Sequence, residues 1–149
     1  MRAVVQRVHR AEVRVDGVPV ATIGRGFLVL VGVFAEDGRE DLTWMAKRIA
    51  QLRVFPDDDG KMNLSPLDIG GEILLVSQFT LCANVKKGNR PSFINAMAPE
   101  PAEAIVLDLG KAIGEYGLQV KTGVFGAMMD VELVNHGPVT IVLDSREFR

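Results

Sequence analysis

The sequence is poor in cysteine and histidine, the residues that most often form disulfides and metal sites. Cys82 is the only cysteine among 149 residues, so no disulfide can form within the chain, which favours a reducing, cytoplasmic setting. One cysteine with His9 and His136 cannot complete a zinc site of the Cys/His type, and no acidic cluster has ligand spacing. A Walker A motif and a dinucleotide-binding glycine motif are also missing. We therefore expect neither a metal nor a cofactor.

Long hydrophobic runs are missing as well. The longest extends from Phe27 to Phe34, eight residues interrupted only by Gly32, whereas a membrane-spanning helix needs about 20. At the start of the sequence, Arg2 and Arg7 stand too close together to leave room for the apolar region of a secretory signal peptide. The sequence therefore predicts no membrane span and no signal peptide.

The chain also lacks a large excess of positive charge. Its formal net charge is −2, which disfavours a protein that holds long stretches of nucleic acid by phosphate contacts. A protein that touches only the end of an RNA through a local basic patch remains compatible with this charge. The length, with 48% hydrophobic and 24% charged residues, is typical of one globular domain, residues 1–149.

The spacing of apolar residues predicts two helices in a chain rich in strands. Helical periodicity covers residues 40–54, and a second helix is expected to open at Pro99 and Pro101 and to end at Gly117. Asp16-Gly17 is a strong signal for a tight hairpin. The order strands, helix, strand, helix, strands predicts an α+β fold with a mostly antiparallel, barrel-like sheet. The expected strands are 2–9, 11–15, 18–23, 27–34, 71–83, 118–122, 128–135 and 139–143.

Polar residues end one of these apolar strands, in the stretch Ser77-Gln78-Phe79-Thr80. Gln78 and Thr80 must find hydrogen-bond partners or water. Such a strand end can offer backbone N–H groups and a hydroxyl to a developing oxyanion. A strand that simply emerges into solvent is the alternative.

A second stretch, Asn135 to Thr140, contains Gly137-Pro138 between two expected strands. A bond before proline is the one common site of a cis peptide, so this segment could hold one. A plain hairpin turn is the alternative. His136 has no identified carboxylate to orient it, and the nucleophile-elbow motif is absent, so a Ser77–His136 esterase pair is conceivable but poorly supported.

A third stretch is basic and contains Lys86, Lys87 and Arg90, followed by Phe93. Three cations within five residues, beside an aromatic ring, can hold a phosphate backbone and stack a base. A solvated loop is the alternative.

Taken together, the chain resembles the D-aminoacyl-tRNA deacylase family. The resemblance runs from residue 1 to about residue 145 without a large insertion. Three positions depart from the family pattern, because His136, Asn84 and Met128 stand where aspartate is expected. The motifs that carry the resemblance are Met1-Arg2-Ala3-Val4-Val5-Gln6-Arg7-Val8, Gly60-Lys61-Met62-Asn63-Leu64-Ser65, Val76-Ser77-Gln78-Phe79-Thr80-Leu81, Lys87-Gly88-Asn89-Arg90-Pro91-Ser92-Phe93, Gly123-Val124-Phe125-Gly126-Ala127 and Asn135-His136-Gly137-Pro138-Val139-Thr140.

The resemblance implies an esterase that hydrolyses D-aminoacyl-tRNA at its 3′ end and removes glycine misattached to alanine tRNA. It implies a homodimer whose active site lies at the interface, where residues 77–80 of one subunit face Gly137-Pro138 of the other. On this resemblance we expect the Gly137-Pro138 bond to be cis, and it would fix two carbonyl groups that exclude L-amino acids.

For catalysis, the resemblance implies that the backbone N–H groups of Phe79 and Thr80 stabilise the oxyanion, while Ser77 and Gln78 shape the site. Lys86, Lys87 and Arg90 would bind tRNA. Another interpretation makes the Thr80 hydroxyl the nucleophile. The main alternative function is a non-catalytic module that binds nucleic-acid ends.

Overall fold

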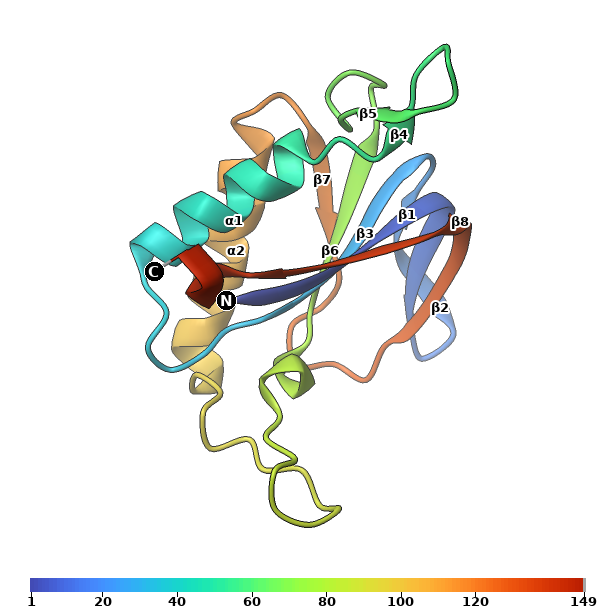
Figure 1. The fold of residues 1–149 in the computed structure, drawn as a ribbon. Helices are drawn as coiled ribbons and strands as arrows, with labels where there is room; N and C mark the ends of the chain where they lie inside the picture. Colours follow the sequence, from blue (N-terminus) through green and yellow to red (C-terminus); the bar gives the residue numbers. More distant parts are fainter. Residues whose placement is uncertain (149) are drawn as a thin grey trace.

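The fold is built on one six-stranded mixed sheet with two helices against it (Figure 1). The computed structural model describes residues 1–148. The strand order is β2-β1-β3-β6-β7. Strands β2 and β3 pair with the two halves of one edge of β1, and β8 pairs with its opposite edge. A separate small hairpin is made by β4 and β5. The elements are β1 (Arg2–Val15), β2 (Val18–Ile23), β3 (Gly26–Gly32), α1 (Arg39–Gln51), β4 (Phe55–Pro56), β5 (Met62–Leu64), β6 (Glu72–Ser77), the 3-10 helix η1 (Phe79–Cys82), α2 (Pro99–Gly114), β7 (Gln119–Thr122), β8 (Asp130–Asp144) and the 3-10 helix η2 (Ser145–Phe148).

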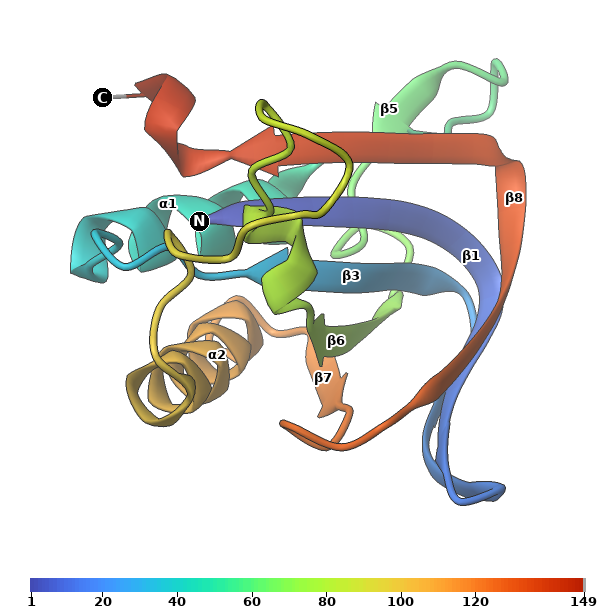
Figure 2. The same ribbon diagram turned by 90° about the horizontal axis from the view of Figure 1, so that it is seen from below.

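The predicted fold class is confirmed. Strand β1 pairs antiparallel with β2, β3 and β8, whereas β3 with β6 and β6 with β7 are parallel. The parallel pairs occur where the chain passes through a helix before it returns to the sheet, as parallel connections require. The long strands β1 and β8 bend together, which gives the sheet its barrel-like curvature (Figure 2).

The hairpin between β1 and β2 forms at Asp16-Gly17, as predicted. The φ angles of these residues are 51° and 76°. Two consecutive positive φ angles are typical of the turn that matches the twist of a two-residue hairpin.

The main hydrophobic core lies between the sheet and the two helices. Every second residue at the start of β1 points into it, so that Ala3 and Val5 are buried beside Phe27 of β3. The helices contribute side chains at helical spacing, among them Ile49 of α1 and Leu109 of α2. No helix of residues 1–148 is long and apolar enough to span a membrane.

Three strand predictions are wrong in their extent. The strands expected over 2–9 and 11–15 are one continuous strand, β1, because β8 pairs with both halves. The strand expected over 71–83 ends at Ser77, because its parallel partner β3 ends at Gly32 and leaves no further ladder to join. The chain turns instead into η1. The strands expected over 128–135 and 139–143 are one continuous strand, β8, because both halves pair with β1. Two register shifts opposite residues 6–10 of β1 absorb the irregular Gly-Pro segment, so it is not a hairpin turn.

Candidate functional site at the end of β6 and in the middle of β8

The polar stretch expected to be catalytic lies where β6 ends. Ser77 is the last residue of β6, and Gln78 leads into η1, which Phe79 and Thr80 open. The Gln78 amide donates to the carbonyl of Val31 at 2.7 Å, which is the last hydrogen bond between this segment and β3. The side-chain amide of Gln78 donates to the Thr80 hydroxyl. This part of the chain is therefore an exposed 3-10 turn fixed on a buried strand.

The turn leaves two backbone donors without a partner in the described chain. The first N–H groups of any helix lack acceptors within the helix. In η1, the Leu81 amide donates to the Gln78 carbonyl at 3.2 Å, but among residues 1–148 the amides of Phe79 and Thr80 donate to no other group. Both residues are exposed. Two adjacent free amides on an exposed turn can donate to an anionic oxygen of a ligand.

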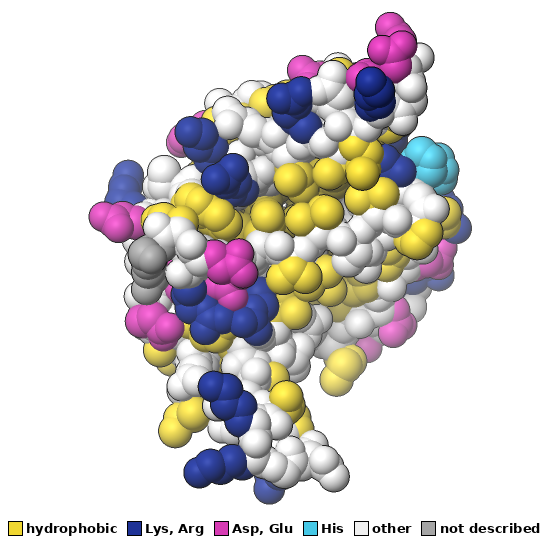
Figure 3. Space-filling model, viewed as in Figure 1, with side chains coloured by type: hydrophobic (Ala, Val, Ile, Leu, Met, Phe, Trp, Pro, Cys, Tyr) yellow, Lys and Arg dark blue, Asp and Glu magenta, His cyan; other side chains and the backbone are white. Residues whose placement is uncertain are grey.

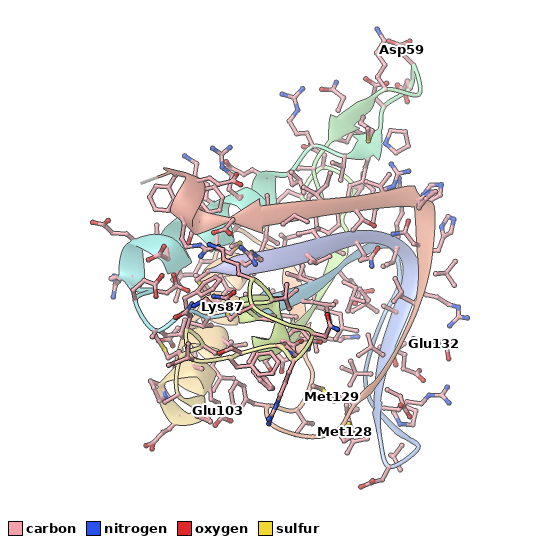
Figure 4. The ribbon with its side chains drawn as sticks, turned by 60° about the horizontal axis from the view of Figure 1, so that its bottom comes forward. Asp59, Lys87, Glu103, Met128, Met129 and Glu132 are labelled. Carbon is pink, nitrogen blue, oxygen red and sulfur yellow. The ribbon has the colours of Figure 1, made fainter. Side chains whose placement is uncertain are left out.

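A cavity of about 250 Å³ opens beside this turn, between β6, β7 and α2. Ser77 and Thr122 supply hydroxyl groups to its wall. Phe125 supplies an aromatic ring to the wall, and Glu103 is the one ionisable residue that lines the cavity. Glu103 lies on α2, as Figure 4 shows. Phe125 and Glu103 were not predicted as site residues. Phe125 lies within one of the family-like motifs, whereas nothing in the sequence around Glu103 distinguishes it from other exposed helical carboxylates.

The second predicted element lies in the middle of β8. The Gly137–Pro138 bond is cis, which is the geometry expected for it, and Gly137 has a φ of 144°. A Cβ atom at Gly137 would lie 2.8 Å from the backbone nitrogen of Val139. Only glycine therefore fits this position without displacing the backbone.

Side chains from β1 and β8 hold the segment in place. The Asn135 side chain bridges the segment, because its Oδ1 accepts from the Val139 backbone amide at 2.8 Å and its Nδ2 donates to the Val139 backbone carbonyl at 3.1 Å. Gln6 of β1 accepts from the Asn135 amide at 2.5 Å and from the Thr140 hydroxyl at 2.7 Å. This network makes the Gly-Pro segment a rigid feature of the sheet.

The buried side chain of Arg7 also holds the Gly-Pro segment in place. This role was not predicted from the sequence. The Nε of Arg7 donates to the carbonyl of His136 at 2.8 Å and its Nη1 to the carbonyl of Val54 at 2.5 Å. The side chain is only 8% exposed, and burial, followed by the charge of Arg25, lowers its pKa. A signal was present, since Arg7 follows Ala3 and Val5 on the face of β1 that enters the core. A cation at such a position requires partners.

His136 stacks on His9 of β1, with ring centroids 4.1 Å apart. Burial, His9 and the two arginines Arg7 and Arg25 lower the pKa of His136. The neighbours of His136 that shift its pKa are thus cationic or neutral, and among residues 1–148 no carboxylate bonds to it to orient it as a general base.

One chain does not bring the two predicted elements together. Ser77 pairs with Val31, which pairs with Ala3, whereas His136 follows Asn135, the partner of Val8. Five residues along β1 correspond to about 16 Å, and two strands, β3 and β1, lie between β6 and β8. A Ser77–His136 pair therefore does not form within a subunit.

The basic stretch is an exposed loop with a fixed base. Backbone hydrogen bonds join Asn84 and Ser92 in both directions, at 2.8 and 3.0 Å. Lys86, Lys87 and Arg90 lie between them and are exposed. No group of three or more potential metal ligands occurs within the described residues.

Comparison with known families gives consistent matches over the whole chain. The family model described as D-Tyr-tRNA(Tyr) deacylase matches residues 4–144. The D-aminoacyl-tRNA deacylase of Anaeromyxobacter dehalogenans is 56% identical over 146 residues, 98% of each chain. That of Thermoanaerobacter pseudethanolicus is 56% identical over 147 residues, 99% of each chain.

Solved structures show the same fold. The structure named c-Myc DNA Unwinding Element Binding Protein superimposes with a TM-score of 0.91 at 46% identity and covers 97% of this chain and 98% of its own. A probable eukaryotic D-amino acid tRNA deacylase superimposes with a TM-score of 0.80 at 18% identity and covers 95% and 97%.

Proposed function

The chain belongs to the D-Tyr-tRNA(Tyr) deacylase family, and on this basis we propose that it proofreads the chirality of aminoacyl-tRNA by hydrolysing the ester of D-amino acids. It is a D-aminoacyl-tRNA deacylase, a hydrolase. Water attacks the ester carbonyl, and the bond to the ribose oxygen breaks after the tetrahedral intermediate forms. The products are free amino acid and tRNA. Its substrate places the enzyme in the cytoplasm, where translation occurs.

The observation that carries the catalytic assignment is the pair of free amides at the start of η1. We assign the N–H groups of Phe79 and Thr80 to the oxyanion of the tetrahedral intermediate, because both are exposed and donate to no other group in the described chain. Ser77 lines the adjoining cavity, which would receive the terminal nucleoside against Phe125. Gln78 would fix the Thr80 hydroxyl, to which it donates.

Chiral selection is assigned to the Gly137–Pro138 segment. Its backbone is held by Asn135, Gln6 and Arg7, so its carbonyl groups form a fixed wall. An L side chain would meet that wall, whereas a D side chain would point away from it. Glycine has no side chain to exclude, which explains why glycine on alanine tRNA would also be a substrate.

This mechanism needs two subunits, because residues 77–80 and Gly137–Pro138 are separated within one chain. The face of the sheet opposite the helices supports a twofold homodimer. Register places Val142, Val4, Leu30 and Val76 in one apolar row across four strands of this face. Val142 is 62% exposed, and hydrophobic side chains gather over β1 and β8 (Figure 3). A second copy that covers this row would bring the two elements together from different subunits.

The catalytic assignment is tested by substitution of Thr80. Thr80→Ala keeps the backbone N–H and is expected to retain measurable hydrolysis of D-tyrosyl-tRNA, and Thr80→Ser to be near normal. Complete loss of activity in a folded, dimeric Thr80→Ala variant would instead make the hydroxyl the nucleophile.

The selectivity assignment is tested with matched D- and L-tyrosyl-tRNA. Wild-type protein should hydrolyse only the D form, and Gly137→Ala should impair binding of the D form because its Cβ would crowd Val139. Similar rates on both substrates in the wild type would contradict selection by this wall.

A second candidate is a non-catalytic module that binds nucleic-acid ends. It is favoured by one observation, the name of the 46% identical relative, which refers to binding of a DNA unwinding element. Purified protein that binds nucleic-acid ends but releases no D-tyrosine from D-tyrosyl-tRNA would establish this candidate.

A further inference from the structure

The basic loop is one end of a longer series of cations. Arg2, at the start of β1, donates from Nη1 to the carbonyl of Leu81 in η1 at 3.0 Å, just before the loop begins. Its Nε also donates to Asp144 Oδ2 at 3.0 Å. Arg2 therefore ties η1 and the base of the loop to the end of β8.

A second arginine shares the same carboxylate. Arg146 donates to Asp144 from Nε at 2.9 Å and from Nη2 at 2.6 Å, and its guanidinium lies 4.0 Å from the centre of the Phe34 ring. These contacts hold the pKa of Asp144 well below its usual range, with Arg146 as the main cause. One carboxylate cannot neutralise two guanidinium groups, so Arg2 and Arg146 together leave a positive charge, partly exposed at 33% and 37%.

Aromatic contacts extend the series to α1. Phe148, in the same short helix as Arg146, stacks on Trp44 with ring centroids 5.2 Å apart. Arg48 lies 5.4 Å from the centre of the Trp44 ring and is exposed. Successive contacts thus link Arg48, through Trp44 and Phe148, to Arg146.

These contacts define a cationic ridge, and Figure 3 shows Lys and Arg side chains spaced along this side of the molecule down to the loop. Asp144, Glu36, Asp37 and Glu147 are the carboxylates within or beside it. Asp37 is paired with the buried N-terminal ammonium, so the six cations of the ridge outnumber the other three carboxylates and positive charge prevails on a chain whose net charge is −2. Two other exposed carboxylates, Asp59 and Glu132, lie away from Lys87 of the loop (Figure 4). The ridge consists of Arg48, Arg146, Arg2, Lys86, Lys87 and Arg90.

We propose that this ridge binds the phosphate backbone of the tRNA acceptor stem and so carries RNA recognition beyond the basic loop to Arg2, Arg146 and Arg48. The inference rests on the proposed function, because the ridge passes η1, where the 3′ end of the substrate is placed and where Arg2 contacts Leu81. A duplex that leaves the site along the ridge meets cations from four separate segments in succession. Arginine suits this role, since its planar guanidinium can bind phosphate oxygens in pairs. Such contacts position the RNA without reading its sequence.

The experiment compares two substrates that share the ester but differ in the stem, D-tyrosyl-tRNA and D-tyrosyl-adenosine. Arg48→Glu is expected to lower kcat/KM for D-tyrosyl-tRNA about three- to tenfold at low salt and to make the slope of log kcat/KM against log salt concentration shallower by roughly one. Its rate on D-tyrosyl-adenosine, which has no stem, should stay within about twofold of wild type. Lys111→Glu on α2 makes the same change of charge off the ridge and should alter neither rate.

A double variant in the exposed loop, Lys86→Ala with Lys87→Ala, should likewise lower kcat/KM for D-tyrosyl-tRNA and keep the rate on D-tyrosyl-adenosine. Thermal melting checks that each variant is folded. If the wild type is active and both ridge variants have the same kcat/KM for D-tyrosyl-tRNA as the wild type, the ridge does not bind tRNA. The proposed function would then stay intact. If a duplex DNA of the length of the acceptor stem binds as tightly as tRNA, the assignment of the ridge to RNA is overturned. A wild type that hydrolyses neither substrate would instead overturn the proposed function.

Discussion

At the scale of single residues, the most informative position is His136, where the family resemblance leads us to expect aspartate. It lies directly before Gly137, stacks on His9, and has its carbonyl bound by Arg7. An aspartate there would face the same arginines with the opposite charge. This chain thus places an imidazole beside the Gly137–Pro138 segment.

The lowered pKa of His136 predicts a pH dependence of stability. A folded-state pKa below the ordinary value means that the unfolded chain binds the proton more tightly. The stabilisation is therefore complete above about pH 6.5 and declines as the pH falls below it. His136→Asp should reduce the drop in Tm between pH 7.5 and 5.5. An equal drop in both proteins would show that His136 is not the group responsible.

Cys82 is predicted to be unreactive in the folded protein. Burial, followed by the charge of Asp37, raises the pKa of its thiol from 9.0 to about 11. At pH 8 this lowers the thiolate fraction roughly 100-fold, and burial blocks access as well. Alkylation by iodoacetamide, followed by mass spectrometry, should be slow in buffer and fast in denaturant. Fast modification of native protein would contradict this.

At the scale of elements, the parallel contact between β3 and β6 positions the turn at residues 77–80. Gly26 lies opposite Glu72 at the start of this pair, and a Cβ at Gly26 would lie 1.8 Å from the Glu72 carbonyl oxygen. Neither backbone can move without shifting the strand that carries Ser77. Close approach of two backbones, more than turn geometry, explains this glycine.

Gly26→Ala is therefore expected to lower the free energy of unfolding by about 1–3 kcal/mol. Urea unfolding measures the effect, and Gly114→Ala is the control, because nothing lies within 4 Å of a Cβ added at that helical position. The control should be neutral or slightly stabilising. Equal stability of the two variants would show that β3 and β6 can separate at no cost.

At the scale of the whole molecule, the proposed site depends on assembly. Val142 on the open face of the sheet and Val18 in β2 are both strongly exposed, at 62% and 61%. They differ in position, since only Val142 lies in the apolar row that a second subunit would cover.

Val142→Glu should therefore convert a dimer into a monomer and abolish hydrolysis, because a buried, unpaired carboxylate is costly at an interface. Light scattering at micromolar concentration measures the state of assembly. Val18→Glu, with almost the same exposure, should remain dimeric and active. A monomeric wild type that is active would refute the shared site.

The sequence by itself determined the fold class, the hairpin at Asp16-Gly17 and the family. These depend on local turn geometry, on the period of the hydrophobic pattern and on motifs that are contiguous in the chain. Tertiary structure alone decided where β6 ends, that β8 is continuous, and that Arg7 supports the Gly-Pro segment. In each case the deciding partner, β3 or β1, is distant in sequence, and hydrogen bonds to such partners override local preference. Tertiary structure also separated Ser77 from Gly137 within a chain, which is why the proposed site requires a second subunit.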